Sequence, residues 1–226
     1  MPSLENKLIV ALDVDSLKKA RHFVDILYPK VKIFKVGSQL FSSCGPEAVK
    51  MILKKGAQVF LDLKFYDIPN TVANAVCQAA RLKVKMLTLH VQGGRPMLLA
   101  AVKSAKEEAT RLKIKQPWLI GVTVLTSRQA QTSQVIKLAR IAKDCGLNGA
   151  VCSVLEAPLI KKTCGRKFLV VTPGIRPGGG NRSDQRRVAT PQQALAAGAD
   201  FIVVGRPIIL AKDPLQETKR ILGQLG

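Results

Sequence analysis

Three charged residues lie close together at the end of one apolar segment. The segment Gln58–Lys64 is rich in residues that favour β-structure, so it predicts a buried strand with Asp62 and Lys64 near its carboxyl end. Side chains alternate across a strand, so these two charges should point to the same side, with Asp67 just beyond the strand. Because a buried charge without a partner is strongly disfavoured, we expect the three charges to compensate one another.

A lysine beside a carboxylate in this position indicates proton-transfer chemistry. Asp62 would keep Lys64 protonated and able to donate. An anionic substrate group placed against Asp62 would be repelled, and the strain would be relieved when that group leaves as a neutral gas. The carbanion left behind could take a proton from Lys64, while remote contacts offset the repulsion. The alternative, for an isolated Asp-x-Lys pair, is a structural ion pair at the mouth of a sheet.

The elements that must position these charges alternate regularly along the chain. Apolar segments predict eight strands, at residues 7–14, 31–37, 58–64, 86–91, 119–125, 149–153, 168–172 and 201–205. Helices are predicted from the Ser16 cap to 28, at 46–55, from an Asn70 or Thr71 cap to 83, from Pro96 to 113, through 134–144, at 156–162, from Thr190 and Pro191 to 198, and after the Asp213 cap.

This alternation predicts the fold class. Strands that alternate strictly with helices form a parallel sheet, and eight such units favour a (β/α)8 TIM barrel, here a single domain of residues 1–226. A doubly wound open sheet is the alternative. Its dinucleotide-binding version is disfavoured because no Gly-x-Gly-x-x-Gly motif follows the first strand.

Polar residues fall at the predicted carboxyl ends of several strands, where the active site of such a barrel lies. They are Asp13, Lys35, Asp62, Lys64, His90, Thr126 and Arg206. This convergence favours a functional site over a structural ion pair, because conflicts with the hydrophobic pattern are expected at functional sites. For His90 a packed, hydrogen-bonded side chain is an equally good interpretation.

A glycine-rich segment at the same end of the barrel indicates phosphate binding. Residues 173–181 follow the seventh strand, and Gly205 and Arg206 follow the eighth. Loops in these two places frequently bind phosphate in this fold, and arginine can donate two hydrogen bonds to a phosphate. The pairing favours a phosphate site over a flexible surface turn, which is the alternative for the glycine run alone.

Composition narrows the function classes. Of the 226 residues 36 are Lys or Arg and 15 are Asp or Glu, a formal net charge of +21. Seven Phe, two Tyr and one Trp offer few stacking platforms, and no nucleic-acid-binding motif is present. A solvated basic surface that attracts small anions is therefore favoured over nucleic-acid binding.

The cysteines and the hydropathy of the chain narrow the function classes further. Five scattered cysteines and two histidines indicate neither a disulfide framework nor a zinc site. No apolar run is long enough to span a bilayer, and residues 1–7 are unlike a targeting peptide, so we expect a soluble, cytoplasmic protein without membrane association.

The charged stretch resembles the signature of the orotidine 5'-phosphate decarboxylase family. The likeness covers Asp62-Leu-Lys64-Phe-Tyr-Asp67-Ile-Pro-Asn-Thr71 and extends from residue 8 to 209. A sister group of magnesium-dependent sugar-phosphate decarboxylases and synthases shares Asp-x-Lys-x-x-Asp. Lys35 distinguishes them, because the sister enzymes carry a carboxylate there that helps to bind magnesium.

The resemblance implies a function. It implies decarboxylation of orotidine 5'-monophosphate to UMP and CO2 in de novo pyrimidine biosynthesis, with no metal and no organic cofactor. Lys64 would be the proton donor and Asp62 the carboxylate that faces the substrate's carboxylate. Lys35 would link this array to the ribose, and Asp13 would bind a ribose hydroxyl. A magnesium-dependent sugar-phosphate lyase and a basic nucleic-acid-binding barrel are the alternative functions.

The resemblance also implies a homodimer with shared sites. In this family Asp67 and Thr71 reach into the neighbouring subunit's site. The remaining substrate contacts would be Thr126 or Ser127 at the pyrimidine, and Arg176, Gln185, Gly205 and Arg206 at the phosphate, with the loop 177–184 closing over the ligand. The chain departs from the family between Ser127 and Gln134, where it is shorter, and in its charge of +21.

Overall fold

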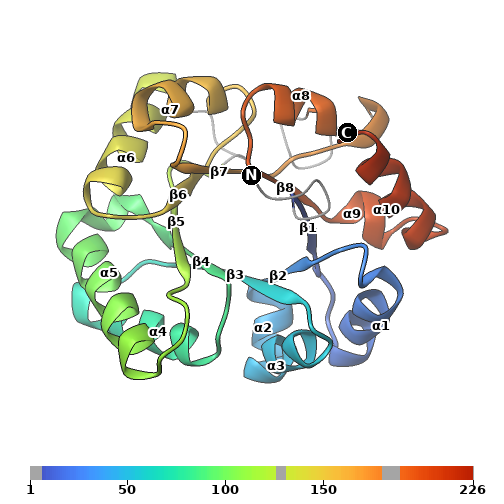
Figure 1. Cartoon of the computed structure of the whole chain (residues 1–226), viewed down its shortest axis with the longest axis horizontal. Coiled ribbons are helices and arrows are strands. Elements are labelled where there is room, and N and C mark those ends of the chain that lie inside the picture. The colour runs from blue at the N-terminus through green and yellow to red at the C-terminus, as the bar shows by residue number, and fades with distance from the viewer. Residues whose placement is uncertain (1–6, 126–130, 180–188, 226) are drawn as a thin grey trace.

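Eight parallel strands form a closed barrel with the helices outside it (Figure 1). The computed structural model describes residues 7–125, 131–179 and 189–225. The strands are β1 (Leu8–Ala11), β2 (Ile33–Gly37), β3 (Gln58–Phe65), β4 (Met86–His90), β5 (Trp118–Val122), β6 (Gly149–Val151), β7 (Leu169–Thr172) and β8 (Phe201–Val204). Closure is made by β1 against β8, with Leu8 opposite Ile202. The predicted TIM barrel is confirmed, and the open-sheet alternative is wrong.

The helices return the chain from one strand to the next. They are α1 (Leu17–Leu27), α2 (Ser38–Cys44), α3 (Pro46–Lys54), α4 (Pro69–Arg81), α5 (Gly94–Arg111), α6 (Thr132–Asp144), α7 (Ala157–Cys164), α8 (Pro191–Ala196), α9 (Arg206–Ile209) and α10 (Pro214–Gly223), with short 3-10 turns at Val91–Gly93 and Pro177–Gly179. None of the helices in the described part of the chain is both long and apolar enough to cross a membrane.

The alternation of side chains along the strands produces two hydrophobic cores. Leu8 and Val10 of β1 point outward into the core between strands and helices, whereas Ile9 and Ala11 point into the barrel. The barrel interior is filled by layers of apolar side chains, including Ile33, Phe60, Met86, Ile120, Val171 and Phe201. This filling makes the barrel a rigid support for the residues at its carboxyl end.

Helix starts follow the predicted caps in three cases. Ser16 accepts a hydrogen bond from the Lys19 amide, Asp213 caps α10 in the same way, and Thr190 forms a capping box with Gln193. These side chains satisfy amide groups that have no partner inside the helix.

Two other predicted starts are wrong. Helix α4 begins at Pro69 after Ile68, so neither Asn70 nor Thr71 is its cap. Proline suits the first helical position because it lacks the amide that a cap would satisfy. Helix α5 begins at Gly94, two residues before Pro96.

Candidate active site

An irregularity in β3 places Asp62 and Lys64. The pairing of β3 with β4 shifts register between Leu61 and Phe65, and Lys64 has a φ of 52°, in the left-handed region that non-glycine residues rarely adopt. The buried hydroxyl of Thr88 on β4 holds this turn. It accepts a hydrogen bond from the Lys64 amide at 2.9 Å and donates one to Asp62 Oδ1 at 2.9 Å.

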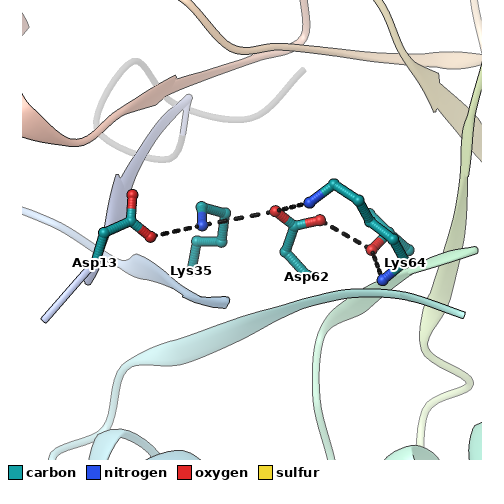
Figure 2. Close-up of polar contacts among 5 residues, drawn as sticks. Asp13, Lys35, Asp62 and Lys64 are labelled. Atoms are coloured by element: carbon teal, nitrogen blue, oxygen red, sulfur yellow. Dashed lines mark hydrogen bonds and ion pairs between the residues drawn. The ribbon is translucent and has the colours of Figure 1, made fainter. Parts of the chain in front are cut away.

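Four side chains of alternating charge follow one another along the ends of β1, β2 and β3 (Figure 2). Lys35 Nζ lies 3.0 Å from Asp13 Oδ1 and 3.6 Å from Asp62 Oδ2. Lys64 Nζ lies 2.9 Å from the same oxygen of Asp62. The predicted proximity of Asp62 and Lys64 is confirmed, and the array continues to Lys35 and Asp13.

The array holds a buried carboxylate in its ionised form. The side chains of Asp62 and Lys35 are 13% and 12% exposed, whereas that of Asp13 is 52% exposed. Burial acts to raise the pKa of Asp62, but the charges of Lys35 and Lys64, with hydrogen bonds from Lys64 and Thr88, outweigh it and hold the pKa below its usual range. Asp62 is therefore a fixed negative charge in a poorly solvated place.

Asp67 takes no part in this array within one chain. Residues 66–71 are all exposed, and the Asp67 carboxylate accepts a hydrogen bond from the amide of Ile68. The expectation that three charges of this stretch compensate one another is wrong for Asp67, because the chain turns outward after Phe65. Thr71 lies on the same exposed segment, in the first turn of α4.

A cavity of about 660 Å³ opens over the array at the carboxyl ends of the strands. Apolar side chains from inside the barrel, such as Phe60, Val171 and Val203, line it together with Asp13, Lys35, Asp62 and Lys64. Gly174, Arg176, Gly205 and Arg206 line it from the ends of β7 and β8. Its volume is in the range of small-molecule sites.

The loop after β7 is anchored at one predicted contact residue. The Arg176 amide donates to the carbonyl of Ala189 at 2.9 Å, and Ile175 forms an isolated bridge with Ala189. Thr126, Ser127, Gln185 and most of the predicted closing loop lie outside the described residues.

His90 ends β4 beside the array. Its ring centroid is 5.4 Å from that of Tyr66, and its buried Nδ1 has no hydrogen-bond partner among the described residues. Burial and the nearby Lys64 charge lower the pKa of His90, with Asp62 opposing them. The imidazole is therefore mostly neutral near pH 7, and none of the described residues fixes the ring by a hydrogen bond to Nδ1.

Sequence reasoning missed two residues of the site. Thr88 lies in an apolar run, and nothing in the local sequence predicts that its hydroxyl would bond Lys64, 24 residues away. Gln39 lines the cavity from α2, a helix that was not predicted.

A match to a family model shows which protein family the chain belongs to. Residues 6–221 match the model of the family described as "Orotidine 5'-phosphate decarboxylase / HUMPS family". The chain belongs to this family. The resemblance inferred from its charged stretch is therefore confirmed.

Relatives named orotidine 5'-phosphate decarboxylase match along nearly their whole length. The protein from Syntrophotalea carbinolica is 46% identical, over 97% of this chain and 95% of its own. That from Geotalea uraniireducens is 45% identical, with the same coverage of each chain. Among solved structures, that of the orotidine 5'-phosphate decarboxylase from Lactobacillus acidophilus has a TM-score of 0.85 and 36% identity, and the match covers 98% of this chain and 99% of that one.

Proposed function

We propose that this protein decarboxylates orotidine 5'-monophosphate to UMP and CO2, a step of de novo pyrimidine biosynthesis. The observation that carries the proposal is the alternating array of Asp13, Lys35, Asp62 and Lys64 beneath a cavity. The family membership and the names of the relatives support the same reaction. A cytoplasmic location belongs to the proposal, because substrate and product are soluble nucleotides.

The array would favour loss of the substrate's carboxylate. Asp62 is ionised and poorly solvated, so a substrate carboxylate placed against it is destabilised by repulsion. When the carbon–carbon bond breaks, its electron pair stays on the ring carbon and the carboxylate leaves as neutral CO2. The Lys64 ammonium then gives a proton to that carbon and is reprotonated from solvent. The two positive charges of the array stabilise the carbanion between these steps.

The opposite side of the cavity would supply the binding energy. Arg206 and Arg176 line it, and their guanidinium groups suit the substrate's phosphate. The phosphate lies far from the bond that breaks, so its binding can offset the repulsion at Asp62. Asp13, half exposed at the edge of the array, would bind a ribose hydroxyl, and Lys35 lies between it and Asp62.

The proposal includes no metal and no organic cofactor. Lys35 lies between Asp13 and Asp62, so ammonium groups already neutralise both carboxylates. Excess chelator should leave turnover unchanged, whereas loss of activity that magnesium restores would favour a sugar-phosphate lyase type of site.

We further propose that the protein is a homodimer in which Asp67 and Thr71 complete the neighbouring subunit's site. The segment that carries them exposes two large apolar side chains, Tyr66 at 60% and Ile68 at 66%. An exposed apolar segment beside a cavity is typical of an interface. The Asp67 carboxylate, turned away from its own array, is available to a second chain.

The absorbance of the orotate chromophore measures the proposed reaction directly. Lys64→Ala should lower the turnover of orotidine 5'-monophosphate by about a thousandfold or more, because a positioned proton donor is lost. Lys50→Ala, in an exposed ion pair on α3, is the control and should retain full activity. Near-normal turnover by a folded Lys64→Ala protein would refute the mechanism.

Mixing two inactive variants tests the shared site. Asp67→Ala should also be inactive if its carboxylate serves the partner. In a mixed dimer of Lys64→Ala and Asp67→Ala subunits one site loses both residues and the other retains both, so activity should reappear on mixing. If the mixture stays as inactive as its components while forming dimers, the sites are not shared.

A further inference from the structure

A second cavity, of about 330 Å³, lies at the opposite end of the barrel, where the strands begin. We call it the amino-end pocket. It is formed by the starts of β3 and β5, the end of α3 and the segments that lead into β4 and β5, with the lining residues Leu53, Gln58, Lys83, Val84, Lys85, Ile114, Lys115, Gln116 and Trp118. None of these residues lines the candidate active site.

The lining of the amino-end pocket is positively charged. Three of its residues are lysines, and none is Asp or Glu. Lys85 is partly buried, and its Nζ lies 2.6 Å from Gln58 Oε1 and 5.0 Å from the centre of the Trp118 ring. Burial lowers the pKa of Lys85, and the positive charge of Lys115 lowers it further. The lysine ammonium groups of the pocket are therefore destabilised by partial loss of solvation and by repulsion between them.

Another lysine at this end of the barrel has a full set of partners and serves as a comparison for Lys85. Lys161, also partly buried, forms an ion pair with Asp200 and donates to the carbonyls of Arg166 and Phe168. Lys85 has no carboxylate partner among the described residues. Its contacts among those residues are an amide oxygen and a ring face, neither of which carries a negative charge, so an anionic ligand would find an uncompensated ammonium group there.

We propose that the amino-end pocket binds a compact polyanion with two or more linked phosphate groups. Several lysines around one concave site match several charges on one small ligand, and ammonium groups bind phosphate oxygens as point charges. Apolar walls from Leu53, Val84, Ile114 and Trp118 reduce solvation and strengthen these attractions. The pocket's volume of about 330 Å³ suits a small ligand better than a polymer, and such a site would account for part of the +21 charge.

The protein contains a single tryptophan, Trp118, and it lies in this pocket. Its fluorescence therefore reports occupancy at the amino end of the barrel. We would titrate the full chain with inorganic triphosphate, ATP and orthophosphate at fixed ionic strength. Triphosphate should change the emission saturably and bind at least about tenfold more tightly than orthophosphate, because it contacts more than one lysine.

The two triphosphates distinguish the sources of the ligand. Equal affinity for inorganic triphosphate and ATP supports a site for the phosphate chain alone. Tighter binding of ATP supports a nucleotide site with the same phosphate recognition. No saturable change in emission with either compound at millimolar concentration overturns the proposal.

Paired charge variants separate the pocket from the general basic surface. Lys85→Gln with Lys115→Gln should weaken triphosphate binding by about tenfold or more. Lys113→Gln with Lys167→Gln removes the same charge from exposed positions at the same end that do not line the pocket, and should weaken binding less than about threefold.

Thermal unfolding gives a second measurement. Triphosphate should raise the Tm of the wild type and of the control pair, but not of the pocket pair, because a ligand stabilises only the state that binds it. Both pairs of variants should turn over orotidine 5'-monophosphate at the same rate as the wild type, because none of the four lysines lines the candidate active site. Equal weakening of triphosphate binding in the two pairs would mean diffuse electrostatic attraction and would overturn the proposal.

Discussion

Replacing Lys35 by glutamine would test the electrostatic coupling of the array. The change keeps most of the side-chain length but removes the charge shared by Asp13 and Asp62. Asp62 would retain Lys64 alone as a cationic partner. Its pKa should therefore rise, and the folded protein should lose the stability that an ionised Asp62 in the intact array contributes.

The magnitude follows from the geometry. Unit charges 3.6 Å apart, the distance from Lys35 Nζ to Asp62 Oδ2, attract by about 4–5 kcal/mol at an effective dielectric constant of about 20. Both side chains are nearly buried, so solvent screens this attraction only weakly. Loss of the repulsion between Lys35 and Lys64 offsets part of it, and we expect the free energy of unfolding at pH 7 to fall by about 2–4 kcal/mol.

The pH dependence identifies the carboxylate involved. In the wild type the folded-state pKa of Asp62 lies below its ordinary value of 3.8. The stability from its ionised form is therefore present above that value and is lost as the pH falls through the folded-state pKa. The difference between Lys35→Gln and wild type should be largest near neutral pH and shrink in the acid range.

Urea unfolding followed by Trp118 fluorescence at several pH values measures this difference. Lys55→Gln is the matched control, because Lys55 and Asp25 form a pair at 2.7 Å whose side chains are 39% and 48% exposed. It should cost about 0–1 kcal/mol. Adding Asp62→Asn to Lys35→Gln should recover part of the loss, because a buried charge is removed with its partner. A cost that is under about 1 kcal/mol, or that is the same at every pH, would refute the coupling.

Two further predictions concern other parts of the molecule. Glu108→Gln should lower the Tm at pH 7 by a few degrees. Hydrogen bonds from Arg111 and Arg81 lower the pKa of Glu108 from 4.5 to about 2, so the difference in Tm should fade as the pH falls from about 4.5 toward about 2. A Tm difference that persists at pH 2 would contradict this. Arg206→Ala should lower kcat/KM for orotidine 5'-monophosphate by roughly 10- to 100-fold, since a charge-assisted contact to phosphate is lost. Unchanged steady-state kinetics would place the phosphate elsewhere.

Local patterns in the sequence predict the barrel well. Each strand is an apolar run in a parallel sheet that is covered on both faces, and such runs are recognisable without knowledge of their neighbours. Caps such as Ser16, Thr190 and Asp213 are equally local, because the side chain bonds an amide within three residues. Short helices such as α2 and α9 were missed because seven or four residues carry too little periodicity.

The sequence by itself determined which residues gather at the carboxyl end of the barrel. Strand ends in a parallel barrel converge, so Asp13, Lys35, Asp62 and Lys64 had to meet once the strands were recognised. The pattern of charges also indicated the family, because it lies within one continuous stretch.

The tertiary structure decided how those residues are held. The left-handed backbone at Lys64 exists because Thr88 of the next strand bonds both its amide and Asp62, a contact between residues far apart in the chain. The outward turn of Asp67 and the amino-end pocket around Lys85 likewise depend on which loops pack side by side. Such contacts form only when the barrel closes, so they cannot be predicted from local patterns in the sequence.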